Sequence, residues 1–234
     1  MQFAPFYPLI HRFLKPNFPN CLWAGDQQVP KIALTFDDGP CPPYTSSLLD
    51  VLDRHHIPAS FFWLGICVDR TPALAQAIHQ RGHWLGLHGY KHHSFASMSL
   101  SQLRQDLEQT KSAIVNACQS SSLTLIDVRP PNGLFTPKTL NLLNQWGYRP
   151  VMWSVIPEDW VQPGVAIVVQ RVLDHVQNGS IIVLHDGYYG GQDVAETVDR
   201  LIPELLGRGY ELVTINQLWT GTTDDWQPLI SQFD

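Results

Sequence analysis

Two adjacent carboxylates end an apolar run near the start of the chain. Residues 31–38 read KIALTFDD, and a Gly-Pro pair follows at once. Two neighbouring aspartates at the end of a buried strand repel each other, and their burial is costly unless a positive charge lies nearby. Asp37 and Asp38 therefore predict a cationic partner.

Two histidines are candidate ligands for such a cation. His88 and His92 lie four residues apart in the segment GLHGYKHHSF. Two imidazoles and one carboxylate form a ligand set for a catalytic divalent ion that keeps one position open for water. One aspartate would then ligate the ion and the other would take a proton from its water, while the cation relieves the repulsion within the pair. The residue types alone leave open which aspartate has which role.

Alternating β-rich and helical segments must position these residues. Seven β-rich runs, interleaved with six helical segments, lie at residues 31–38, 59–65, 83–89, 123–131, 149–155, 179–186 and 210–218. Several helical segments end at a Gly that leads directly into the next run, which is the short connection of an alternating fold. Apolar strands buried on both faces are typical of a parallel sheet. The sequence thus predicts an α/β fold, a distorted parallel (β/α) barrel with about seven strands.

The barrel is predicted to form a single domain. No low-complexity linker interrupts residues 31–220, which we expect to fold together. Residues 1–30 would form an N-terminal arm and residues 221–234 a C-terminal tail, both packed on the barrel.

Ionisable residues that could take part in catalysis lie at one end of the predicted strands. They follow the carboxyl ends of five of the seven runs: Asp37, Asp38, His88, Arg129, Asp159, His185 and Asp186. In α/β barrels and open parallel sheets, the carboxyl ends of the strands meet at one mouth, where catalysis takes place. A structural explanation exists for each residue singly, since a lone Asp after a strand is often a helix cap. Five strands that each end in an ionisable group favour a functional site instead.

Composition excludes several classes of protein. The formal net charge is −6 and no run of basic residues is present, so the chain has no electrostatic footprint for nucleic acid or an anionic membrane. No apolar run reaches about 18 residues, so no transmembrane segment is predicted. Residues 1–20 lack the basic region and the cleavage site of a signal peptide, which predicts a protein that is cytoplasmic or peripheral at the cell envelope.

The four cysteines carry no metal or redox motif. Cys21, Cys41, Cys67 and Cys118 include no C-x-x-C pair, so neither a zinc knuckle nor a thioredoxin-type site is predicted. We expect scattered thiols, with Cys41 lying just past the Asp-Asp-Gly-Pro turn.

Five motifs along residues 31–218 resemble, in their order, those of the polysaccharide deacetylase (NodB homology) family, carbohydrate esterase family four. The stretch TFDDGP is similar to the first motif, which implies Asp37 as the catalytic base and Asp38 as a metal ligand. The stretch HGYKH resembles the second motif, H-[ST]-x-x-H, which implies His88 and His92 as the other metal ligands.

The third motif of the family is R-x-P-x-[GW], and RPPNG resembles it. This resemblance implies that Arg129 orients the base Asp37 and keeps it ionised. Asn132 stands where an aromatic residue is common, and its backbone N–H would stabilise an oxyanion. Gly89, in the second motif, stands where a hydroxyl residue is usual, which removes a supporting hydrogen bond but no ligand.

The last two motifs concern a proton donor and the walls around it. IPEDW resembles D-x-x-D-W with Ile156 in place of the first Asp, so Asp159 would pair with the general acid and Trp160 would form part of the groove wall. VLH resembles L-x-H, so Val183 would line a pocket for the acetyl methyl group and His185 would be the general acid.

Further aromatic residues lie around the predicted mouth. Four of them would either stack on pyranose rings or pack in the core: Tyr90, Trp160, Tyr188 and Tyr189. Three tryptophans that lie within predicted strands are expected to be packing residues: Trp63, Trp84 and Trp153.

The family implies a metal-dependent hydrolase that removes acetyl groups from the N-acetylated or O-acetylated sugars of a glycan. Its cofactor would be a divalent metal that lowers the pKa of bound water, with zinc as the first assignment and Co²⁺, Ni²⁺ or Mg²⁺ as alternatives. Two other functions stay open. One is a different amide hydrolase on the same scaffold, such as a deformylase of a sugar lipid or an amidohydrolase of a small ureide. The other is a non-catalytic glycan-binding protein, against which the complete set of acid, base and ligands argues.

Overall fold

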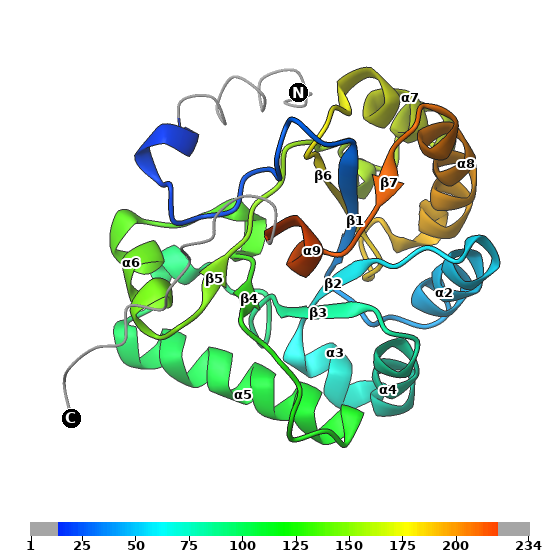
Figure 1. Cartoon of the computed structure of the whole chain (residues 1–234). Helices are drawn as coiled ribbons and strands as arrows, with labels where there is room; N and C mark the ends of the chain where they lie inside the picture. The colour runs from blue at the N-terminus through cyan, green and yellow to red at the C-terminus, as the bar shows by residue number, and fades with distance from the viewer. Residues whose placement is uncertain (1–13, 220–234) are drawn as a thin grey trace.

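Among the residues that the structure describes, seven parallel strands form the centre of the molecule (Figure 1). The computed structural model describes residues 14–219, and its strands are β1 (Lys31–Asp37), β2 (Ser60–Trp63), β3 (Trp84–Leu87), β4 (Asp127–Val128), β5 (Arg149–Pro150), β6 (Ile181–His185) and β7 (Glu211–Leu212). Each strand lies within one of the expected β-rich runs. The predicted tail, residues 221–234, lies outside the described residues, as do residues 1–13 of the predicted arm.

Helices connect the strands and surround them. They are α2 (Tyr44–His55), α3 (Gly65–Arg70), α4 (Pro72–Gln80), α5 (Leu100–Cys118), α6 (Pro137–Gln145), α7 (Val165–His175), α8 (Val194–Gly207) and α9 (Ile215–Trp219). Short 3-10 turns lie at Lys15–Asn17, Phe95–Ser97, Pro131–Gly133, Asp159–Val161 and Gly191–Asp193. Within residues 14–219, no helix is both long enough and apolar enough to span a bilayer.

Helix α9 corrects one expectation, because the run at 210–218 is a strand only over Glu211–Leu212. A reciprocal cap explains the switch to helix. The Thr214 N–H donates to Gln217 Oε1 at 2.8 Å, and the Gln217 N–H donates to Thr214 Oγ1 at 3.4 Å. This Thr-x-x-Gln capping box starts a helix where the apolar pattern alone indicated a strand.

The strands form a ring in the order β5-β4-β3-β2-β1-β6, with β7 paired to the start of β1. The ring closes just beyond β5, because Val155 forms a bridge with Ile182 of β6, and the Val183 N–H donates to the Val155 carbonyl at 3.1 Å. The predicted arm contributes as well, since the Leu22 N–H donates to the Pro150 carbonyl at 2.8 Å. The distorted parallel (β/α) barrel is therefore confirmed.

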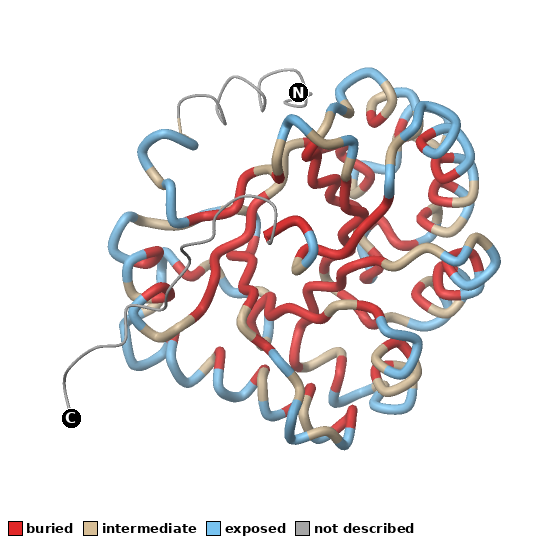
Figure 2. Tube along the Cα trace, in the orientation of Figure 1, coloured by how far each residue is buried: buried red, intermediate tan, exposed pale blue. Residues whose placement is uncertain are grey.

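Strand β1 is buried on both faces, as Figure 2 shows for most of the strands. Leu34 and Phe36 face the helices and belong to the larger apolar cluster, whereas Ala33 belongs to a smaller cluster inside the ring. Side chains alternate along a strand, so Thr35 and Asp37 point to the inside together with Ala33. The strand thus delivers a carboxylate to the interior at its carboxyl end.

A buried ion pair lies at the amino ends of the strands. Asp127, at the start of β4, accepts two hydrogen bonds of 2.8 Å from Arg149 of β5. The indole N–H groups of Trp84 and Trp219 donate to the same carboxylate at 2.6 and 3.1 Å. The Arg149 guanidinium also lies 5.0 Å from the centroid of the Trp219 ring. This cluster ties α9 to β3, β4 and β5, and in Figure 1 α9 lies within the ring of strands.

The Asp127 cluster predicts a large loss of stability on mutation. Asp127→Ala would leave Arg149 buried without its carboxylate, so the free energy of unfolding should fall by about 3–5 kcal/mol in urea denaturation. The exposed pair of Arg200 and Glu196, 2.6 Å apart, provides a control, because Glu196→Ala should cost less than about 1 kcal/mol. Equal effects of the two substitutions would contradict the role of the cluster.

Candidate active site

The carboxyl end of β1 places the two aspartates differently. Asp37 is the last residue of the strand and is in register with His185 of β6. Asp38 follows with a φ of 74°, in the left-handed region, which turns its side chain away from the strand direction. A Cβ at Gly187 would lie 2.4 Å from the Asp38 Cβ, so only glycine permits this close approach of β1 and the β6 loop. The two carboxylates therefore face different partners.

Asp38, His88 and His92 form a cluster that fits a divalent metal ion. Each offers one ligand atom, and the three atoms lie within 4.8 Å of one another. The Asp38 Oδ1 atom is 3.5 Å from His88 Nε2 and 3.4 Å from His92 Nε2. Oδ1 is buried and has no hydrogen-bond partner among the described residues, which is costly for a carboxylate oxygen unless a cation binds it. Two imidazoles and a carboxylate are the ligand set of many catalytic zinc sites.

The ring of His88 is held in the form that binds a metal. Its Nδ1 lies 2.7 Å from the Arg129 carbonyl, which can only accept a hydrogen bond, so Nδ1 carries the proton and Nε2 has the lone pair that faces the cluster. Burial lowers the pKa of His88 by more than Asp37 and Asp38 raise it. The imidazole is therefore neutral, as a metal ligand has to be.

Arg129 provides the positive charge that Asp37 needs. Its Nη1 donates to Asp37 Oδ1 at 2.6 Å and to Thr35 Oγ1 at 2.9 Å, and Nη2 donates to the Met152 carbonyl at 3.1 Å. The guanidinium is fully buried and lies 4.0 Å from the centroid of the Phe62 ring. Burial lowers the pKa of Arg129 and Asp37 opposes the shift, but a guanidinium stays protonated. One oxygen of Asp37 is thus fixed, and the other borders the cluster, 4.0 Å from His88 Nε2.

His185 and Asp159 form a second charged pair across the mouth. Asp159 Oδ1 lies 2.8 Å from His185 Nδ1, and Asp159 Oδ2 accepts the His185 backbone N–H at 2.7 Å. Burial alone disfavours the imidazolium, but the Asp159 carboxylate outweighs it and, with Asp38 and Asp37, raises the pKa of His185 from 6.5 to about 9. Because Nδ1 is bound to Asp159, Nε2 is the atom left for the pocket.

These groups line one cavity of about 350 Å³. Its walls are Asp37, Asp38, His88, His92, Asn132, Trp153, Ile156, Trp160, Val183, His185 and Tyr189. The structure therefore brings together the predicted base, acid, ligands and three of the four predicted substrate-binding residues. Arg129 and Asp159 lie behind Asp37 and His185 and hold them in place.

Tyr90 is the predicted substrate-binding residue that the structure places elsewhere. Its hydroxyl donates to Asp69 Oδ2 at 2.8 Å, and its ring packs so closely on Gly65 that a Cβ there would lie 2.5 Å away. Tyr90 is absent from the walls of the cavity. The reason is the turn between His88 and His92, which directs the two imidazoles inward and the tyrosine toward α3.

Trp153 packs against both apolar clusters, as expected, but it also lines the cavity and does not lie within a strand. Strand β5 ends at Pro150, so Trp153 lies beyond the carboxyl end, on the segment that crosses to β6. A Cβ at Gly133 would lie 2.7 Å from the Trp153 ring, so this glycine lets the loop after β4 close over the indole. Trp153 lies near the carboxyl end of the predicted run 149–155, and this position was the available signal.

The pKa of His185 predicts a pH-dependent stability in the metal-free protein. Folding raises this pKa from 6.5 to about 9, so the stabilisation is complete below about pH 6.5 and is lost as the pH rises through about 9. Asp159→Asn should therefore lower the free energy of unfolding much more at about pH 6 than at about pH 10. An NMR titration of the imidazole gives the pKa directly, and a His185 ring that titrates below 6.5 in the wild-type protein would contradict the pairing.

Comparison with known proteins gives consistent matches. The family model described as polysaccharide deacetylase matches residues 24–151. The chain is 35% identical over 192 residues to a peptidoglycan-N-acetylglucosamine deacetylase of Bacillus cereus, covering 80% of this chain and 87% of that protein. It is 34% identical over 199 residues to a chitooligosaccharide deacetylase of Sinorhizobium fredii, covering 80% and 91% of the two chains.

A solved structure shares the fold closely. The crystal structure of the Bc1960 peptidoglycan N-acetylglucosamine deacetylase superposes with a TM-score of 0.82 at 26% identity, and the match covers 88% of this chain and 95% of that one. The match to the family model spans β1 to β5 and includes Asp37, His88 and Arg129. On these grounds the chain belongs to the polysaccharide deacetylase family.

Proposed function

We propose that this protein is a metal-dependent hydrolase that removes acetyl groups from the N-acetylated sugars of a glycan. The observation that carries the proposal is the single cavity in which a metal-ligand cluster, an anchored carboxylate and a paired histidine face one another. The names of the relatives support an N-acetylated glycan as the substrate. A cavity of about 350 Å³ is large enough for one sugar unit of such a polymer.

Asp38, His88 and His92 would hold the metal ion, for which we propose zinc. When bound, such an ion acts as a Lewis acid and lowers the pKa of water, which is the chemistry that amide hydrolysis needs near neutral pH. The buried Oδ1 of Asp38 supplies the charged ligand, and the Arg129 carbonyl fixes the His88 tautomer.

Asp37 would be the general base. Arg129 occupies its Oδ1, so Oδ2 is the oxygen that accepts the proton from the attacking water. The 2.6 Å hydrogen bond fixes the direction of the carboxylate, and a fixed base at hydrogen-bond reach of its proton is the geometric condition for this role. Asp37 Oδ2 lies 4.0 Å from His88 Nε2, so the proposed base is next to the ligand cluster.

His185 would be the general acid that protonates the leaving amine. Asp159 raises its pKa to about 9, so the ring is protonated at neutral pH and its Nε2–H can be donated into the cavity. The Trp160 ring lies edge-to-face against the His185 ring, at a centroid distance of 5.2 Å, and this contact limits the rotation of the imidazole. Proton transfer of this kind contributes typically about 10²–10⁴-fold to the rate.

The remaining walls would select the substrate. Val183 and Ile156 offer an apolar surface for the acetyl methyl group, while the backbone N–H at Asn132 would stabilise the oxyanion. Trp160 and Tyr189 present aromatic rings to the pyranose. The Ile156 side chain takes the place of a carboxylate in the motif, so the cavity is more apolar on this side.

A screen for released acid tests the substrate class. We expect the zinc-loaded protein to release acetate from chitooligosaccharides or peptidoglycan fragments, and to release no formate from sugar lipids. Acetylxylan tests O-acetylated sugars in the same assay. Formate without acetate would favour the deformylase alternative. Glycan binding without release of either acid would favour a non-catalytic glycan-binding protein.

Asp37→Asn tests the base. An amide cannot accept the proton, although its oxygen still accepts a hydrogen bond from Arg129, so kcat should fall by about 10²–10⁴-fold while zinc binding persists. Acetate release near the wild-type rate would rule out the mechanism. The matched control is His88→Ala, which should lose the metal itself. Retention of a stoichiometric ion by His88→Ala would contradict the ligand set.

A further inference from the structure

The loop that carries both histidine ligands is a strained segment. Between His88 and His92, Gly89 has a φ of 84°, and His92 itself has a φ of 59°. A non-glycine residue in the left-handed region costs about 1–2 kcal/mol, so the loop keeps this shape only if the surroundings hold it. The anchors of the loop therefore decide where the His92 ring points.

Two of the carbonyl groups in the loop have backbone donors. The Gly65 N–H donates to the Gly89 carbonyl and the Ile66 N–H donates to the Tyr90 carbonyl, both at 3.1 Å. The N–H of Tyr90 has a side-chain acceptor instead, because Asp106 Oδ2 accepts it at 2.8 Å. Tyr90 is the middle residue of the loop, so this hydrogen bond lies midway between the two histidine ligands. Asp106 is on α5 and comes from outside every motif of the family.

Glycine at position 89 makes room for this carboxylate. A Cβ at Gly89 would lie 3.0 Å from Asp106 Oδ2 and 3.2 Å from Cε1 of Phe95, which is tighter than ordinary contact. The motif has a hydroxyl residue at this position, and in this chain the space beside it is filled by Asp106. The chain thus lacks the hydroxyl group of the motif and has the Asp106 carboxylate in the space beside Gly89 instead.

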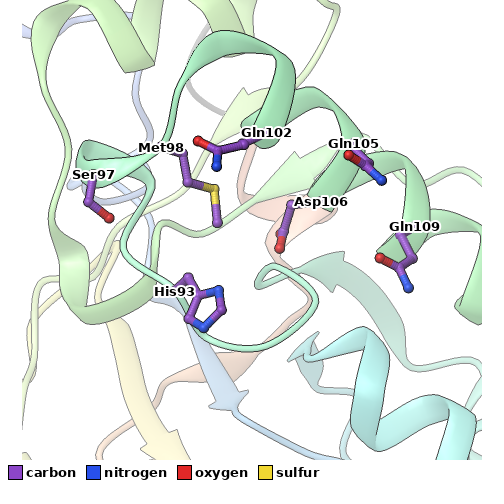
Figure 3. Close-up of a pocket in the computed structure, with 7 residues that line it drawn as sticks. All are labelled: His93, Ser97, Met98, Gln102, Gln105, Asp106 and Gln109. Carbon is purple, nitrogen blue, oxygen red and sulfur yellow. The ribbon is translucent and has the colours of Figure 1, made fainter.

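Helix α5 holds Asp106 rigidly. Leu103, Leu107 and Thr110 lie on the same face of the helix and are buried, and α5 packs against α3 and α4. Figure 3 shows the Asp106 carboxylate pointing from α5 toward the loop that carries His93, at the edge of a pocket of about 320 Å³. A group on a well-packed helix positions its partner more accurately than a group on a loop.

We infer that Asp106 is a positioning residue that holds the loop between His88 and His92 in the geometry of the metal site. Through the N–H of Tyr90, it replaces the support that a hydroxyl residue at position 89 would give. The inference rests on the ligand assignment of the proposed function. It adds a residue on α5 to the metal site without making that residue a ligand.

Zinc affinity of the metal-free protein tests the inference, measured by competition with a chromogenic chelator. Asp106→Ala should weaken zinc binding about 10–100-fold, the usual effect of losing a group that orients a ligand. Asp106→Asn keeps an acceptor oxygen and should bind within about threefold of the wild-type protein. Gln105→Ala is the control, because Gln105 lines the same pocket and, among the described residues, forms no hydrogen bond with the loop; the zinc affinity of this variant should not change.

The thermal midpoint of each metal-free variant separates positioning from folding. A lower midpoint in Asp106→Ala with an unchanged zinc affinity would overturn the inference, because it would assign Asp106 to the fold. If Asp106→Ala does not fold, Asp106→Ser makes the same measurement, and failure of both to fold would also assign Asp106 to the fold. A wild-type protein that binds no zinc would instead overturn the ligand set, which keeps the two failures distinct.

Discussion

The structure depends on how two adjacent carboxylates at the end of β1 are neutralised. Asp37 is almost fully buried and meets its charge partner within the protein, since Arg129 binds one of its oxygens at 2.6 Å. Asp38 turns away from the strand and faces two imidazoles, with a buried oxygen that no described protein group satisfies. One carboxylate is thus anchored by a permanent cation of the chain, and the other is left for a cation from solution. This difference in partner is what gives two identical side chains different roles.

The barrel supplies the geometry for that division. Alternation along β1 sends Leu34 and Phe36 to the helices and Asp37 to the interior. Pairing of β1 with β6 places His185 in register with Asp37, so the proposed acid and base lie on neighbouring strands. The Val155 bridge to β6 closes the ring and brings the segment with Asp159 beside His185. At the opposite end of the barrel, the ion pair of Asp127 with Arg149 holds α9 within the ring, so the mouth is the open end.

Sequence patterns predicted the residues that meet at the mouth better than the residues that shape it. The carboxyl ends of strands are set by apolar runs, so Asp37, His88 and His185 were found from their register alone. Tyr90 was expected at the mouth and Trp153 within a strand, and both expectations failed, because the direction of a loop side chain depends on turn geometry, such as the positive φ of Gly89, that apolar periodicity does not encode. Helix α9 was missed for a local reason, the cap formed by Thr214 and Gln217. The contact of Asp106 with the ligand loop spans 16 residues and follows only from the packing of α5.

The most direct test of this account is the position of a bound metal in a crystal grown with zinc, located by anomalous scattering above and below the zinc absorption edge. The account predicts one peak within about 2.0–2.2 Å of a carboxylate oxygen of Asp38 and of Nε2 of His88 and His92, with Asp37 outside ligand distance and still bound to Arg129. A zinc ion held by Asp37, or found only away from this cluster, would contradict it.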